Sequence, residues 1–306
     1  MPRCIDCGVD IVWNGRFGPL DQPRCSTCLE RWRKRKRGPR WRFAQSPAAP
    51  VTWCAIAAAA VCSILYLQGH ALAHDLTEDQ IAIWDGELWR LITGSFVHAG
   101  ILHLIFNAYW TWRFGSVIEG WMGSVRFLGF FTLVALGSSA AQFVISGPGV
   151  GLSGVAYGLF GILYALRRSK GFAAQQMNRQ IVSLFVGWFI LCVILTYTNV
   201  WSVGNVAHGA GAVLGWLVGK AILSHRPKTL LAGLSMAVFG LFLLTLYMPW
   251  NGFYALHRAK KCEDRGDTAG AIYSYRRATR AFRDHPELEE HFRELREDQE
   301  NPPKDE

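Results

Sequence analysis

Hydrophobic residues gather in seven long runs in the middle of this chain, whereas polar residues dominate both ends. The runs cover residues 50–68, 100–117, 125–146, 151–167, 181–198, 203–223 and 229–248. Each comes close to the roughly 20 residues that an α-helix needs to cross the hydrocarbon core of a bilayer. None alternates with the period of two that a membrane β-strand shows. The pattern therefore predicts an all-α polytopic membrane protein.

The polar ends divide the chain into three predicted parts. Charged residues make up only 18% of the chain, below the roughly one quarter that is usual in soluble proteins, and they concentrate outside residues 50–249. We therefore expect an N-terminal segment over residues 1–45, a membrane domain over 50–248 and a C-terminal segment over 252–306. No cleavable signal peptide is expected, because the first apolar run begins only near residue 50.

Positive charge is concentrated before the first apolar run. Residues 1–42 hold eleven Lys and Arg against four Asp and Glu, with an almost continuous basic run over 31–37. Such a run can bind nucleic acid, but its place beside a membrane span favours a cytoplasmic anchor with an attraction for anionic lipid. The acidic loop 69–99 then falls on the outer side, and so do residues 249–306 if the seventh run crosses the membrane.

Ser153 and His208 are the candidate reactive residues, because each lies in a glycine-rich apolar run. Ionisable residues at membrane depth are costly and tend to be kept for function. A serine hydroxyl is a weak nucleophile without an adjacent base, and histidine is the usual base near neutral pH. Neither run contains a carboxylate, so a Ser–His dyad is expected rather than a triad.

Glycines on both runs would let the two helices approach closely and bring the hydroxyl within reach of the imidazole. They are Gly154, Gly158 and Gly161 on one run and Gly211 and Gly215 on the other. Tyr157, one helical turn after Ser153, could stack on His208. His103 and Asn107 are spaced i, i+4 at a similar depth, so they could join the Ser153 N–H as donors to a developing oxyanion.

Each residue alone also has a plain structural explanation. A serine between glycines is usually a packing residue, and a membrane histidine or asparagine can simply join helices by hydrogen bonds. The soluble-hydrolase motif Gly-x-Ser-x-Gly does not fit, because Val155 replaces its second glycine. A proton-relay transporter would need intramembrane carboxylates that the spans lack. The shared depth, face and chemistry of the set favour a reactive site.

Together these motifs resemble the rhomboid family of intramembrane serine proteases over about residues 50–223. The matching pieces, in the family's order, are Glu87–Arg90, His98 to Asn107, Glu119, Gly151–Gly154 and Ala207–Gly211. The resemblance implies that Ser153 is the nucleophile and His208 the general base. It also implies that His103 and Asn107 help form the oxyanion hole, with Tyr157 against the histidine and His98 and Gly151 in support.

The resemblance also implies a six-helix core, here followed by a seventh span, and a place in a bacterial inner membrane. The expected substrates are single-span membrane proteins, cut in or near the span. No cofactor is expected for the chemistry and no nucleic acid as a partner, only substrate and membrane lipid. The alternative is a non-catalytic rhomboid-like scaffold that binds transmembrane helices.

Four cysteines near the N-terminus have the spacing of a zinc ribbon. Cys4 and Cys7 form one Cys-x-x-Cys pair, and Cys25 and Cys28 form a second one after 17 residues. Four thiolates suit a closed, structural zinc site. A pair of disulfides is the rival interpretation, but the expected cytoplasmic side is reducing. We therefore expect bound zinc with a structural role.

The C-terminal segment contains one helical hairpin over residues 252–284. Its small and aromatic positions, among them Ala259, Gly266, Ala271 and Tyr275, resemble a single tetratricopeptide unit. One such unit is fewer than the three or so that stacked repeats need to be stable. The alternatives are that it packs on the membrane domain or on another chain, or that it is simply an amphipathic hairpin; peptide binding is the less favoured role. The charged tail 294–306 is expected to be disordered.

Overall fold

The structure, a computed structural model, describes residues 9–10, 27–28, 49–282 and 284–300. The chain divides into two units, residues 1–47 and 48–306, and nearly all of the described residues belong to the second. In that unit they form helices joined by short connections, with no strand. The predicted division into three parts stays a prediction.

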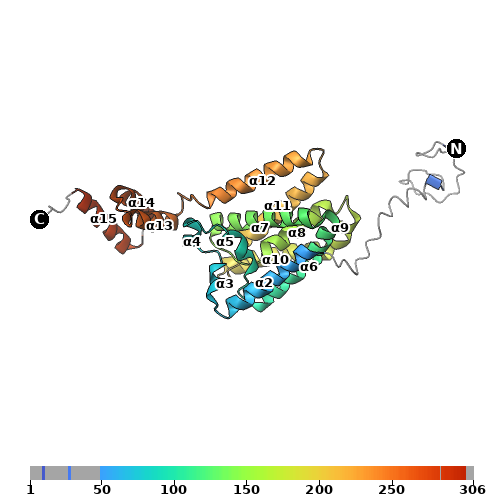
Figure 1. Cartoon of the computed structure of the whole chain (residues 1–306), viewed down its shortest axis with the longest axis horizontal. Helices are drawn as coiled ribbons and strands as arrows, with labels where there is room; N and C mark the ends of the chain where they lie inside the picture. Colours follow the sequence, from blue (N-terminus) through green and yellow to red (C-terminus); the bar gives the residue numbers. More distant parts are fainter. Residues whose placement is uncertain (1–8, 11–26, 29–48, 283, 301–306) are drawn as a thin grey trace. The chain divides into compact units, whose positions relative to one another are not determined.

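Seven long helices follow the seven apolar runs (Figure 1). They are α2 (Pro50–Leu67), α6 (Ile101–Met122), α7 (Ser124–Ser146), α8 (Ser153–Leu166), α10 (Arg179–Tyr197), α11 (Asn205–Leu223) and α12 (Pro227–Leu244). Five of them, namely all except α6 and α8, are individually long and apolar enough to cross a bilayer. The predicted all-α polytopic membrane fold is therefore confirmed.

Helix α6 forms part of a sharply bent segment. Together with α5 (Arg90–Thr93) and the 3₁₀ turn η1 (Gly94–Phe96), it is long and apolar enough to cross a bilayer. The segment 90–96 and helix α6 meet at an angle of 99°. The break falls on residues 97–100, which include His98. The bend therefore turns the chain into the bundle where the candidate oxyanion donors begin.

Helix α8 is shorter than its apolar run suggested. Its 14 residues rise about 21 Å, whereas the hydrocarbon core of a bilayer is about 30 Å thick. Eleven of the fourteen are buried, because α8 packs against α6, α7 and α11 (Figure 1). The helix is therefore short and largely enclosed by its neighbours, and its first residue is Ser153.

Helices α8 and α11 meet at their glycines, with backbone against backbone. A Cβ atom added at Gly211 would lie 2.0 Å from the carbonyl oxygen of Gly154, and one added at Gly215 would lie 1.9 Å from that of Gly158. No side chain fits at such distances. The glycine pattern therefore fixes the closest helix pair in the bundle, and this pair carries both candidate reactive residues.

The connection between α2 and α6 is built from short helices, α3 (Ala71–Asp75), α4 (Gln80–Trp84) and α5. Arg90 organises it from an almost buried position. Its guanidinium forms a short, two-point contact with Glu87 and donates to the carbonyl oxygens of His74 and Thr77. Charge-assisted contacts of this kind are strong and directional, so the loop has a defined shape above the bundle.

Glu119 joins the opposite end of the bundle. Its carboxylate accepts hydrogen bonds from the backbone N–H groups of Val51 and Thr52, at 3.0 and 2.9 Å, and from the hydroxyls of Thr52 and Ser124. These two N–H groups belong to the first turn of α2, which has no partner within its own helix. One buried carboxylate therefore ties α6 to the starts of α2 and α7.

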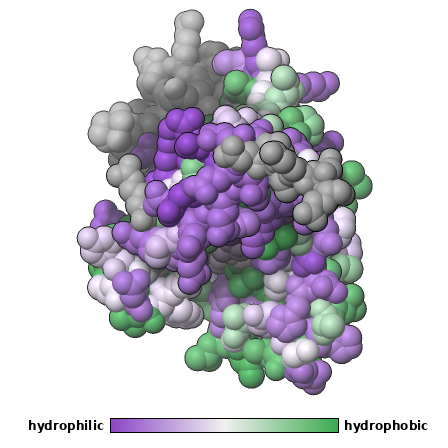
Figure 2. Space-filling model, turned by 90° about the vertical axis from the view of Figure 1, so that its left-hand side faces the viewer, coloured by the Kyte–Doolittle hydropathy of each residue, from purple (hydrophilic) through white to green (hydrophobic). Residues whose placement is uncertain are grey.

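The C-terminal segment forms three helices, α13 (Gly252–Glu263), α14 (Thr268–Ala281) and α15 (Pro286–Glu300), and its surface is mainly hydrophilic (Figure 2). The first two form the predicted hairpin. The prediction of disorder from residue 294 was wrong as far as residue 300, which ends α15. Leu288, Phe292 and Leu295 form an apolar stripe that packs on the core of the hairpin, and this burial offsets the charge of the other positions.

Helix α13 packs against α4, in the connection between α2 and α6. The ring centroids of Trp84 and Tyr254 are 5.2 Å apart. Tyr254 belongs to an apolar cluster with Met248 and Phe143, and Trp84 packs against this cluster. Lys261 forms an ion pair with Asp85, and its hydrogen bond lowers the pKa of that carboxyl. Helix α13 therefore lies at the same end of the bundle as loop 69–99.

Candidate active site

Ser153 is the first residue of α8 and follows a loop whose shape depends on Gly151. This glycine has φ of +104°, in the region that side chains disfavour. Its N–H donates to the carbonyl oxygen of Gly94 at 3.0 Å, and an added Cβ would lie 2.8 Å from the ring of His103. Glycine is therefore required there, both for the turn and for the close approach of the histidine.

His208 lies in the first turns of α11 and is 3% exposed. Its ring stacks on that of Tyr157, with centroids 4.6 Å apart and planes inclined by 20°. The Tyr157 hydroxyl in turn donates to the carbonyl oxygen of Phe185 on α10 at 3.0 Å. Among the described residues, Nδ1 of His208 has no hydrogen-bond partner. The imidazole is therefore oriented by an aromatic ring, without a carboxylate.

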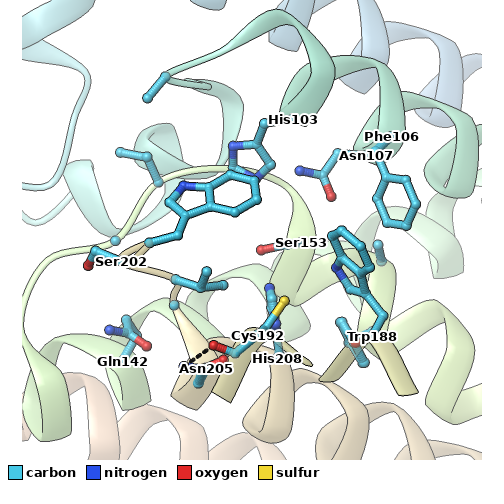
Figure 3. A pocket seen from close by; sticks show the side chains of 18 of the residues that line it. His103, Phe106, Asn107, Gln142, Ser153, Trp188, Cys192, Ser202, Asn205 and His208 are labelled. Carbon is cyan, nitrogen blue, oxygen red and sulfur yellow. Dashed lines mark hydrogen bonds between the residues drawn. The ribbon is translucent and has the colours of Figure 1, made fainter. Parts of the chain in front are cut away.

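One cavity of about 870 Å³ brings the candidate residues together. Ser153 and His208 lie on one side of it, and His103 and Asn107 project from α6 on the other (Figure 3). Asn107 is 2% exposed, and its Nδ2 has no partner in the described part of the chain. A buried donor without a partner is costly, and here it faces the space in front of the serine.

His98 stands behind the cavity and holds the residue before the nucleophile. The N–H of Leu152 donates to its Nε2 at 3.2 Å, so the neutral ring carries its proton on Nδ1. That nitrogen donates to the Ser63 hydroxyl at 3.1 Å, and this hydroxyl donates to the carbonyl oxygen of Phe96. His98 thus positions the start of α8, and its ring meets that of His103 edge-on at 4.8 Å.

Two residues that sequence reasoning did not single out also hold the loop before Ser153. Glu78, in the connection between α3 and α4, is 8% exposed and accepts from the N–H of Gly149 at 2.8 Å. Gln142, on α7, accepts from the N–H of Ala207 at 3.2 Å and donates to the carbonyl oxygen of Gly147. The loop is thereby tied to Glu78 directly and, through Gln142, to the start of α11. Contacts between residues so far apart in the sequence leave no local pattern from which they could be predicted.

We expect replacement of Glu78 by glutamine to change how stability depends on pH. Burial raises the pKa of the Glu78 carboxyl to about 8, although the Gly149 N–H and the Ser139 hydroxyl oppose this. The folded chain therefore retains a proton that the unfolded chain releases near its ordinary pKa of 4.5. This group then destabilises the fold as pH rises from 4.5 to 8, by at most about 5 kcal/mol.

Thermal unfolding in detergent between pH 5 and pH 8.5 measures this effect. The midpoint of the wild type should fall relative to that of Glu78→Gln across this interval, because glutamine cannot ionise. Parallel curves for the two proteins would show that the Glu78 carboxyl does not titrate in this range.

The arrangement suits acyl transfer. It combines a hydroxyl at a helix start, a buried imidazole and several donors around one cavity, which are the parts that such chemistry requires. Among the described residues, no group of three or more His, Cys, Asp or Glu side chains could hold a metal ion. Cys4, Cys7 and Cys25 lie outside the described residues, so the predicted zinc site stays a prediction.

Comparisons with known proteins identify relatives for the membrane part of the chain. Residues 85–225 match the family model of the Rhomboid domain. The chain is 31% identical over 153 residues to Rhomboid protease GlpG of Haemophilus influenzae, across 48% of this chain and 76% of that protein. It is 29% identical to the proteins of the same name from Serratia proteamaculans and Salmonella typhi, of which 66% and 61% are covered.

Proposed function

Because this chain belongs to the rhomboid family, we propose that it is an intramembrane serine protease with Ser153 as nucleophile and His208 as general base. The observation that carries the proposal is the shared cavity, which both side chains line from the two most closely packed helices. The stacked Tyr157 ring supports it, because it orients an imidazole that has no carboxylate partner.

In the proposed mechanism, His208 takes the proton from the Ser153 hydroxyl as Oγ attacks the carbonyl carbon of a peptide bond. The oxygen that becomes negative is stabilised by the Nδ2 group of Asn107, by His103 and by the backbone N–H of Ser153. His208 then gives its proton to the leaving amine, and an acyl-enzyme remains. A water molecule, deprotonated by His208, hydrolyses this ester and restores the serine.

We propose that the substrates are single-span membrane proteins, cleaved in or near the span. The cavity supports this, because much of its wall is apolar and comes from α6 and α10, including Ile105, Phe106, Leu184 and Trp188. An extended, partly apolar peptide fits such a wall better than a charged one, since buried charges require partners.

A fluorophosphonate probe tests the reactive pair directly. The full chain in detergent should be labelled once, at Ser153, because such probes form a stable bond only with an activated serine. Replacing His208 by asparagine should reduce the labelling rate at least about 100-fold. Equal labelling of the wild type and the His208 variant would refute the proposed Ser–His dyad. No labelling of the wild type would favour the non-catalytic, helix-binding scaffold.

We also propose that the four N-terminal cysteines bind a structural zinc ion, on the grounds of their spacing and chemistry alone. The full chain, purified without chelator, should contain about one zinc per chain. A Cys25→Ser, Cys28→Ser double variant should lose it, whereas Cys54→Ser, Cys62→Ser should keep it. A metal-free wild type would refute this proposal and leave the protease proposal untouched.

A further inference from the structure

A basic cleft lies within the C-terminal segment, between the start of α13 with the residues before it and helix α14. It has a volume of about 500 Å³ and is bounded by residues 249–252 on one side and by α14 on the other. Three arginines, Arg276, Arg277 and Arg280, line it together with Trp250 and Tyr273. No Asp or Glu is found among the described residues that line the cleft. The cleft is therefore strongly positive, and it lies apart from the candidate active site.

The three arginines have different structural roles. Arg277 is half-buried and fixed, because it donates to the carbonyl oxygen of Pro249 and to the Tyr273 hydroxyl. Arg276 and Arg280 are exposed, and neither forms an ion pair with any residue that the structure describes. Arg277 thus holds the cleft together, while the other two guanidinium groups are available to an anion.

The chain places this cleft at the boundary of the membrane. Helix α12 ends at Leu244, and Trp250 follows after six residues, which can span no more than about 20 Å. Four large aromatic side chains of this segment are more than half exposed: Tyr247, Trp250, Phe253 and Tyr273. Trp250 and Tyr273 line the cleft itself. Exposed Trp and Tyr next to a span are typical of the headgroup region, where the apolar ring and the polar edge are both satisfied.

We propose that this cleft binds the phosphate group of an anionic phospholipid. Arginine forks match phosphate oxygens with two parallel hydrogen bonds, and basic pockets beside spans attract anionic headgroups. The aromatic rim and the nearness of α12 favour a lipid over a soluble anion, because the lipid tails can lie along the apolar face of that helix. The proposal does not depend on the protease activity.

Native mass spectrometry of the full chain tests it. The protein is released from a nonionic detergent after incubation with equal amounts of dioleoyl-phosphatidylglycerol and dioleoyl-phosphatidylcholine. The wild type should retain the anionic lipid in preference to the neutral one. An Arg276→Gln, Arg280→Gln variant should bind phosphatidylglycerol about thirtyfold more weakly, with unchanged affinity for phosphatidylcholine.

The matched control is an Arg258→Gln, Arg265→Gln variant, which removes two exposed charges from the same hairpin outside the cleft. It should keep the wild-type preference, and circular dichroism should show both variants folded. An equal loss in the control, or no preference in the wild type, would overturn the proposal. Displacement of the lipid by inorganic phosphate or by a glutamate-rich peptide at a concentration no higher than that of the lipid would overturn it as well, in favour of a soluble anion or a protein partner.

Discussion

Replacing Ser153 by alanine is expected to abolish cleavage of a single-span membrane protein, with a loss of at least about 10⁴-fold in rate. The expectation rests on position: Ser153 starts α8, so its N–H is free of helical bonding and its side chain lines the cavity that contains His208. Alanine removes the nucleophile while keeping the helix start. The measurement is the rate of product formation in liposomes that hold the purified chain and one substrate.

Ser202→Ala is the control for this experiment. Ser202 lines the same cavity from the connection before α11, so its removal tests whether the loss of any hydroxyl there matters. We expect its rate to stay within about threefold of the wild type, because exposed surface substitutions have small effects. Cleavage by the Ser153 variant at the wild-type rate would exclude this serine as the nucleophile, whereas no cleavage by the wild type would favour the non-catalytic scaffold.

The membrane helices could be predicted from the sequence because their signal is local. Each apolar run specifies its own helix, since the backbone must satisfy its hydrogen bonds internally in lipid. The length of α8 could not be predicted in this way. Residues 151–152 are as apolar as the helix that follows, but the positive φ of Gly151 and the contact with His98 take them out of it. Ser153 therefore becomes the first residue of α8.

The candidate site divides along the same line. Residue type and spacing were enough to predict Ser153, His208 and the glycines from the sequence. The i, i+4 interval was enough to predict His103 and Asn107. Glu78 and Gln142 could not be predicted in this way, because Glu78 contacts Gly149 across 71 residues and Gln142 contacts Ala207 across 65. In the sequence, Glu78 is one of five acids in an outer loop. Only the folded chain shows that it is buried.

Helix α15 was missed for a different reason: its charged composition led to a prediction of disorder, although a short apolar stripe also favoured a helix. Its many charged residues favour disorder when they are considered alone. Its three apolar residues, spaced i, i+4 and i+7 from Leu288, form one stripe, and that stripe has a partner only because the hairpin offers an apolar surface. A sequence without its tertiary partner cannot decide between these outcomes.

Replacing Gly215 by alanine is expected to impair activity about 100-fold or more and to lower the thermal midpoint, although this residue touches no reacting group. The new Cβ would lie 1.9 Å from the carbonyl oxygen of Gly158, so α8 and α11 must separate by about 1.5 Å to restore an ordinary contact of 3.4 Å. Ser153 and His208 lie on these two helices. A misplacement of about 1 Å between reacting groups can cost about 100-fold in rate.

Gly209→Ala separates this steric effect from the general effect of adding a methyl group to α11. A Cβ atom there would meet only Phe189, at 3.9 Å, so we expect nearly wild-type cleavage and a slightly higher stability, because alanine is the better helix former. If the two variants behave alike, the glycine contact does not set the distance between the helices. If Gly215→Ala alone loses cleavage and also fluorophosphonate labelling, the close approach of the two backbones is what brings the imidazole to the serine.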